Sequence, residues 1–163
     1  MGNGNIWITI DGIKGTFARE GEAKDAIEVD SFSWGIHNAH GASGGSGETQ
    51  AGKAHFGELN ITKSCDVNSP KIMLAVAECT AIKKVVLGYM KQINSTNQTY
   101  IYFTLENAFL ISQQIHGSGE NPGESVSIAY SKLKIEYKPQ KPDGKSLDGA
   151  VGGCFDIKTN KKV

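Results

Sequence analysis

Residues 124–138 read ESVSIAYSKLKIEYK, and their apolar side chains alternate with polar ones. The alternation begins on even positions and ends on odd ones, at Val126, Ile128 and Tyr130 and then at Leu133, Ile135 and Tyr137. A period of two is typical of a half-buried β-strand. A change of parity inside an extended segment is what a β-bulge produces, because the bulge inserts one extra residue. The stretch therefore predicts a long, bulged strand in a strongly curved antiparallel sheet.

The same period runs through most of the chain. Residues 27–37 repeat the change of parity, with Ile27 and Val29 followed by Phe32, Trp34 and Ile36. Further strands are expected at about 6–10, 53–65, 83–93, 99–115 and 151–158.

A helix is expected at about 69–81. Ser69 would be its N-cap, and Pro70 would take the first helical position, where a missing N–H costs nothing. Ile72, Met73, Val76 and Ala77 then recur at helical spacing. Together with the strands, this predicts a mostly β fold: an antiparallel β-barrel or sandwich of two sheets with one short flanking α-helix. The 163 residues fit a single domain over 1–163.

The composition narrows the classes of partner. Lys plus Arg and Asp plus Glu number 17 each, so the formal net charge is zero. A neutral chain lacks the basic excess that binding to nucleic acid or to an anionic membrane surface requires. Near-zero charge also removes self-repulsion and so permits self-association. The N-terminal residues do not read as a signal peptide, and no stretch reaches the length of a membrane span, so the expected location is cytoplasmic, without membrane insertion.

Candidate catalytic and metal-binding motifs are incomplete. Residues 47–54 match the phosphate-binding pattern GxxxxGK, but Ala54 replaces the Ser or Thr that would hold magnesium, and Lys53 opens a strand pattern. His37 and His40 have a spacing that suits a metal, without further ligands nearby in sequence. The three cysteines form no CxxC pair and are expected to be buried, inert thiols, Cys65 in a strand and Cys79 on the helix. No catalytic, cofactor or metal site is therefore predicted, and the protein is not expected to be an enzyme.

Two features point to self-association. Residues 38–52 form a Gly/Ser/Ala-rich stretch longer than an ordinary loop in a compact domain. In the strand around Phe32 and Trp34, Ser31 and Ser33 occupy the opposite face, which gives one packed side and one wet side.

Several segments, taken together, resemble the hemolysin-coregulated protein (Hcp) family, the tube protein of bacterial type VI secretion systems. The stretches that carry this resemblance, in family order, are residues 8–15 (ITIDGIKG), 27–35 (IEVDSFSWG), 51–53 (AGK), 61–63 (ITK), 69–75 (SPKIMLA), 124–128 (ESVSI), 135–140 (IEYKPQ) and 156–158 (DIK). The chain departs from the family pattern at Gln92–Asn97, at Phe109–Gln114 and at Cys154-Phe155, where a Gly-Trp pair is expected.

The resemblance implies a function as well as a fold. Hexameric rings of the protein would stack into the inner tube of the secretion machine, contact its spike and sheath components and carry effector proteins in the lumen. The protein would be secreted through the machine without a signal peptide. Ser31 and Ser33 would line the pore. A loop would reach the neighbouring ring, made of Gly41, Ala42, Ser43, Gly44, Gly45, Ser46, Gly47, Glu48, Thr49 and Gln50.

The alternative is a monomeric β-sandwich module that binds a carbohydrate or peptide. Such a module would present an exposed aromatic platform, so the burial of Trp7 and Trp34 discriminates between the two hypotheses.

Overall fold

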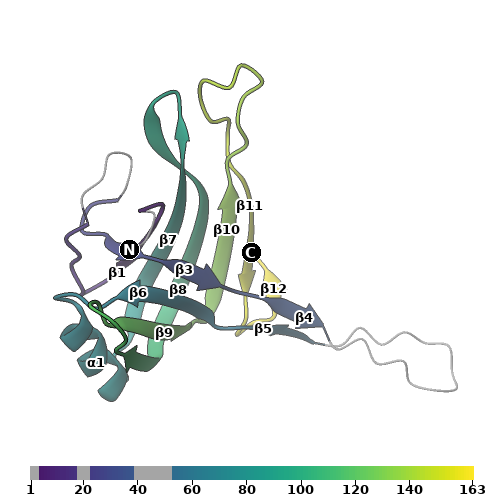
Figure 1. Ribbon diagram of the computed structural model, residues 1–163. Coiled ribbons are helices and arrows are strands. Elements are labelled where there is room, and N and C mark those ends of the chain that lie inside the picture. The colour runs from purple at the N-terminus through teal and green to yellow at the C-terminus, as the bar shows by residue number, and fades with distance from the viewer. Residues whose placement is uncertain (1–3, 18–22, 39–52) are drawn as a thin grey trace, which may run out of the picture.

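The computed structural model describes residues 4–17, 23–38 and 53–163, and these residues are mostly in strands (Figure 1). The strands are β1 (Ile6–Ile10), β2 (Ile27–Val29), β3 (Ser31–Ser33), β4 (Ile36–Asn38), β5 (Ala54–Phe56), β6 (Leu59–Ser64), β7 (Ile82–Ile93), β8 (Thr96–His116), β9 (Gly123–Ala129), β10 (Lys132–Tyr137), β11 (Val151–Asp156) and β12 (Lys161–Lys162). Helix α1 spans Ser69–Ala77.

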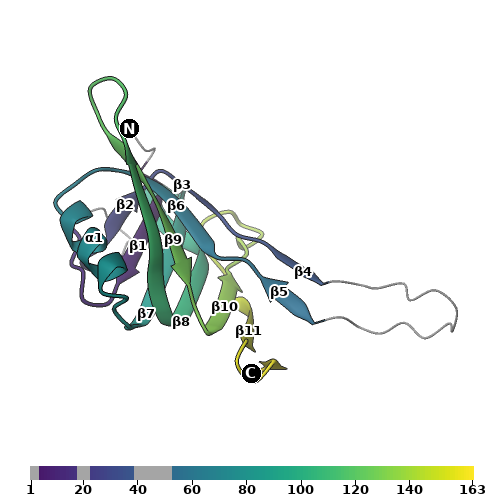
Figure 2. The same cartoon turned by 90° about the horizontal axis from the view of Figure 1, so that it is seen from below.

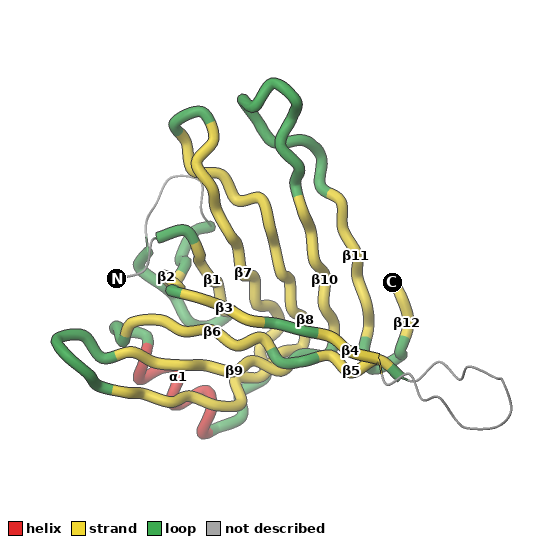
Figure 3. The backbone as a smooth tube through the Cα atoms, turned by 45° about the vertical axis from the view of Figure 1, so that its right-hand side comes forward, coloured by secondary structure: helices red, strands yellow, loops and turns green. Residues whose placement is uncertain are grey.

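Two antiparallel sheets face each other, with the strands of one running across those of the other (Figure 3). The larger sheet has the order β12-β11-β10-β8-β7-β1-β2, and the smaller sheet has the order β3-β6-β9-β8. β4 and β5 pair with each other as a separate ribbon. The predicted two-sheet β fold with one flanking helix is confirmed over the described residues. The larger sheet ends at β12 and β2, so these strands form no closed barrel.

The changes of parity in the sequence mark passages between the two sheets. β2 pairs with β1 in the larger sheet, whereas β3, one residue later, pairs with β6 in the smaller sheet. Likewise β9 pairs with β6 and β10 pairs with β8. The prediction of a single bulged strand at each place was wrong. A strand that turns from one sheet into the facing sheet must change which parity points inward, because the core then lies on its other side.

β8 is the strand that belongs to both sheets. Its first half pairs with β7 and β10, and residues 109–116 pair with β9. Between the halves, Asn107 has a φ of 51°, in the left-handed region. Bulges are present elsewhere, between Tyr89 and Met90 and between Leu110 and Ser112, where the register shifts. These irregularities bend β8 so that one strand serves two sheets.

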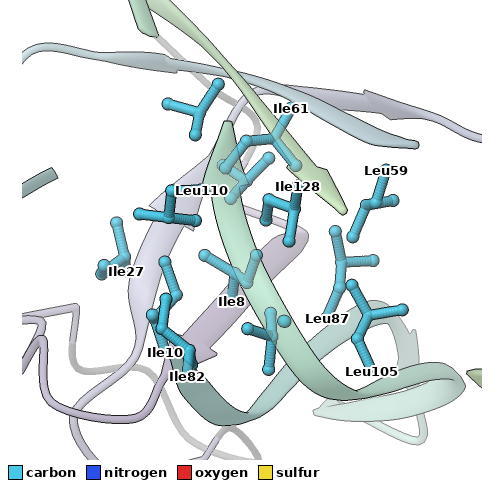
Figure 4. Close-up of a cluster of buried hydrophobic side chains, with 14 of the residues drawn as sticks. Ile8, Ile10, Ile27, Leu59, Ile61, Ile82, Leu87, Leu105, Leu110 and Ile128 are labelled. Carbon is cyan, nitrogen blue, oxygen red and sulfur yellow. The ribbon is translucent and has the colours of Figure 1, made fainter. Parts of the chain in front are cut away.

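The hydrophobic core lies between the sheets. Figure 4 shows side chains from both sheets pointing toward one another: Ile8, Ile10, Ile27, Ile82, Leu87 and Leu105 from the larger sheet, and Leu59, Ile61, Leu110 and Ile128 from the smaller sheet. All of them are buried. Burying a side chain of this size stabilises the fold by about 1.5–3 kcal/mol, so this cluster is what holds the sheets together.

Trp7 is buried on the opposite face of the larger sheet. Its indole N–H donates a hydrogen bond to Thr99 Oγ1 at 3.0 Å, and its ring lies over Gly88. A Cβ at Gly88 would come within 2.3 Å of that ring, so a side chain there would displace the tryptophan.

Helix α1 contacts β8 and buries Ile72 and Ala75 (Figure 2). Its N-cap is Asn68 and not Ser69, and its last residue is Ala77, four residues before the predicted end. Ser69 begins the helix and uses its hydroxyl to donate to Glu124 Oε1 at 2.9 Å. The helix stops because Cys79 adopts a φ of 51°.

Candidate functional site

The outward face of the smaller sheet is built from hydroxyl and amide side chains. In β3 and β6, Ser31 stands opposite Thr62 and Ser33 stands opposite Asn60. The same rows continue into β9, where Ser125 pairs with Thr62 and Ser127 with Asn60, and into β8 at Ser112 and Gln114. We call this set the hydroxyl face: Ser31, Ser33, Asn60, Thr62, Ser112, Gln114, Ser125 and Ser127. None of these eight side chains is charged or apolar, whereas Phe109 stands opposite Ala129 in the next row and Ile111, at the β8 bulge, is 42% exposed.

Hydrogen bonds between strands order the hydroxyl face. The hydroxyls of Ser31 and Thr62 lie 2.5 Å apart, and Ser127 Oγ donates to Asn60 Oδ1 at 2.6 Å. Ser31, Ser33, Asn60 and Thr62 are exposed, so their remaining hydrogen-bonding capacity faces solvent. The structure therefore brings the two serines that the sequence singled out into one continuous hydrated surface.

The inward side of the same strands is apolar, with one exception. Ile61, Val126 and Ile128 are buried in the core. Between them and α1 lies an ion pair, in which Lys63 Nζ is 2.5 Å from Glu124 Oε1 and both side chains are at most 1% exposed.

Further polar groups surround this ion pair. Glu124 also accepts from Gln113 Nε2 at 2.6 Å, and Lys63 Nζ lies 3.1 Å from the Asp66 carboxylate. Because each buried charge has partners, the network fixes α1 against the smaller sheet. It also lets Lys63 and Glu124 occupy inward positions in strands whose other inward side chains are apolar.

The β4–β5 ribbon projects away from the two sheets (Figures 1 and 2). Its base is held by aromatic contacts, since the Phe56 ring stacks on Phe155 of β11 with centroids 5.1 Å apart. The predicted ring-stacking loop, Gly41–Gln50, lies outside the described residues, and so does His40. Lys53 precedes strand β5 and not a helix, as the sequence indicated for the incomplete phosphate-binding pattern.

Both tryptophans belong to packed clusters. Trp7 is buried, and Trp34 is half-buried against Phe56 and Phe103. Trp34 Nε1 donates to Tyr130 Oη at 2.6 Å, and that hydroxyl donates to the Gly57 carbonyl at 2.6 Å. Burial raises the pKa of Tyr130 further above neutral pH, where its hydroxyl is already protonated and can donate this second bond. Neither tryptophan offers the exposed platform that the ligand-binding alternative requires.

The predicted burial of the thiols was wrong. Cys79 is exposed beyond the end of α1, and Cys65 and Cys154 are half-buried. Within the described ranges, no three or more His, Cys, Asp and Glu side chains gather as a metal site would require. In the part of the chain that the structure describes, no helix is long and apolar enough to cross a membrane.

Part of the hydroxyl face was missed by reasoning from the sequence. Asn60, Thr62, Ser125 and Ser127 alternate with buried apolar residues, just as Ser31 and Ser33 do. That alternation is a usable signal, but only the pairing of β3, β6 and β9 shows that the three strands are neighbours.

Known proteins share this fold and its sequence pattern. A family model described as "Type VI secretion system effector, Hcp" matches residues 7–137. Protein hcp1 of Pseudomonas aeruginosa is 27% identical over 110 residues, which cover 66% of this chain and 68% of that protein. The structure of a type six secretion system protein has a TM-score of 0.87 at 26% identity, over 98% of this chain and 99% of the other. The crystal structure of Hcp1 from Salmonella typhimurium has a TM-score of 0.78 at 26% identity, over 98% of both chains. The chain belongs to the Hcp family of type VI secretion system proteins.

Proposed function

We propose that this protein forms homohexameric rings that stack into the inner tube of a type VI secretion system and carry effector proteins in the lumen. It catalyses no reaction in this role. Family membership supports the proposal, and the observation that carries it furthest is the hydroxyl face, eight neighbouring hydroxyl and amide side chains on one sheet surface.

The hydroxyl face has the chemistry that a transport lumen needs. Ser, Thr, Asn and Gln side chains bind water well, so an effector touching them exchanges one hydrated contact for another. These eight side chains offer little apolar surface that would hold a cargo by burial, and they carry no charge that would favour cargo of one sign. Ser31 and Ser33, on the edge strand β3, line the lumen in this arrangement.

Ring closure requires a heterologous contact, in which one face of each protomer meets a different face of the next. An exposed apolar patch at the far end of the larger sheet is suited to one half of that contact. Tyr137 of β10 and Val151 of β11 stand opposite each other and are 46% and 70% exposed. Tyr100 contacts the Tyr137 ring with centroids 5.7 Å apart. Contiguous apolar surface of this kind typically marks a protein contact.

Stacking would use a second surface. The β4–β5 ribbon leads into Gly41–Gln50, which we propose reaches the neighbouring ring. Spike and sheath components would contact the assembled tube. The chain would leave the cell through the secretion system, as its membership of the Hcp family suggests.

The mass of the protein in solution tests the proposal. Light scattering should give about six times the 17.4 kDa of one chain, and negative-stain images of the same fraction should show rings. A monomer at every concentration, including at low salt, would contradict ring formation by the chain itself and favour the ligand-binding alternative.

A further inference from the structure

His37 and His55 stand directly opposite each other in the β4–β5 ribbon. They are register partners, and their imidazole rings are stacked with centroids 5.0 Å apart and planes inclined by 20°. Both side chains are exposed. Two histidines in contact, on a ribbon that projects from the body of the protein, are not used by the core or by the hydroxyl face.

We propose that His37 and His55 form a two-histidine site for a divalent transition-metal ion of the class that prefers imidazole, such as Zn²⁺, Ni²⁺ or Cu²⁺. The side chains come from two adjacent strands, so one ion would bridge β4 and β5. Both ligands come from one chain, so the site does not require ring formation, and its cleft borders the hydroxyl face through Ser33 and Asn60.

The separation of the rings suits chelation. With a metal–nitrogen bond of about 2.0–2.1 Å, two imidazoles on one tetrahedral ion have ring centres roughly 5 Å apart. The observed centroid distance of 5.0 Å already matches this value. Only rotation of the rings about their own side-chain bonds is needed to turn a nitrogen of each toward a common point, and the backbone can stay in place.

The surroundings leave the ion open to solvent. Both histidines line a cleft of about 450 Å³ that also contains Glu58 and Asn60. The Glu58 carboxylate adds negative charge to the same cleft, which favours a cation. No third His, Cys, Asp or Glu among the described residues completes a metal cage, so water or a bound chelator would fill the other positions. The affinity is therefore expected to be moderate.

Metal binding would act on the ribbon itself. A two-stranded ribbon is marginally stable alone, and this one is anchored by Phe56 on Phe155 and by the bond from Gly57 N–H to the Gly35 carbonyl at 2.9 Å. An ion shared by His37 and His55 would link the strands beyond that anchor. Its effect would be to fix the ribbon as it leaves the body of the protein.

The test is calorimetric titration of Ni²⁺ into the full chain without a histidine tag and with its thiols reduced. Wild type should bind one ion per chain, and His37→Ala and His55→Ala should each weaken binding by about 100-fold or more, because a chelate becomes a single ligand. His116→Ala is the matched control, since His116 lies on β8 away from the ribbon and should leave the affinity unchanged.

Two results would overturn the proposal. One is the absence of Ni²⁺ binding by wild type at millimolar concentration. The other is loss of binding in His37→Ala and His40→Ala with binding retained in His55→Ala, which would replace the cross-strand pair by the pair that sequence spacing suggests. Circular dichroism of each variant checks that the fold is intact, so that a loss reports the ligand and not unfolding.

Discussion

At the scale of single residues, the least expected feature is a complete ion pair inside an alternating β pattern. The pattern of β6, LNITKS, places Lys63 on the inward parity with Leu59 and Ile61. A lysine is almost never fully buried without a partner. Glu124 on β9 is that partner, and register brings the two together across the smaller sheet. The ion pair is therefore part of the fold and is not available for chemistry.

Lys63→Met tests this interpretation. The substitution leaves the Glu124 carboxylate buried without its cation, so the free energy of unfolding should fall by about 3–5 kcal/mol. The double variant Lys63→Met/Glu124→Leu should recover much of the loss, since an apolar pair replaces two charges of similar volume. Urea denaturation at fixed protein concentration measures both, because association shifts apparent stability.

The matched control is Lys132→Met. Lys132 forms an ion pair with Glu106 at 3.3 Å, but both side chains are partly exposed, at 34% and 44%. A surface pair of this kind contributes little, so the urea midpoint should stay close to that of wild type. Equal effects of Lys63→Met and Lys132→Met would show that the buried network does not anchor α1.

At the scale of elements, the fold depends on places where the chain passes from one sheet to the other. Val29 and Phe32, on opposite parities, both pack into the core because Asp30 lies between strands of different sheets. In β8 the passage occurs within one strand, at Asn107 with its φ of 51°. Asn and Gly tolerate this left-handed conformation, and a β-branched side chain does not.

Substitution of Asn107 tests the role of this conformation. Asn107→Val should lower the free energy of unfolding by about 1–2 kcal/mol, whereas Asn107→Gly should leave it nearly unchanged. Thermal unfolding should show the valine variant melting roughly 2–8 °C lower. Asn97→Val, on the same strand but outside the left-handed region, is the control. Asn107→Val melting at the wild-type temperature would mean that β8 bends without needing this conformation.

The elements were largely predictable from the sequence, and their partners were not. A period of two marks β6 and β9, because each has one buried face and one wet face, and β1 alternates although both of its faces are covered. The parity changes were visible, but sequence alone does not tell a bulge from a change of sheet, since both shift the inward face by one residue. The bulge at Tyr89 and Met90 follows Gly88, but its position is fixed only by the register with β8.

The candidate site was also predictable only in part, since its local pattern could be read from the sequence and its strand pairing could not. Ser31 and Ser33 were recognised from local alternation. The rows that join them to Asn60, Thr62 and Ser127 depend on register between segments about 30 to 100 residues apart, which no local pattern specifies. His37 and His55 are similar, because 17 intervening residues separate them in the sequence and one ladder position joins them in the structure.

At the scale of the whole molecule, two surfaces of opposite character lie on different sheets. The hydroxyl face covers the outside of the smaller sheet, and the apolar patch of Tyr100, Tyr137 and Val151 lies on β8, β10 and β11 of the larger sheet. A monomer gains nothing from exposing Val151 at 70%, whereas a ring that buries it gains apolar burial at every protomer contact. This arrangement would keep the proposed ring contact apart from the proposed lumen.

Charge substitution in the patch tests this assignment. Tyr137→Asp and Val151→Glu each place a charge in the proposed ring contact, where it would be desolvated without a partner. Light scattering should show the hexamer replaced by monomer or by partial rings, while circular dichroism and the thermal midpoint stay close to wild type, because both side chains are exposed in the single chain. Val67→Asp is the matched control. Val67 is 68% exposed, precedes α1 and lies away from the patch, so this variant should remain hexameric. Hexamers in both patch variants would assign the ring contact to other residues, and dissociation in all three would indicate a general effect of added charge.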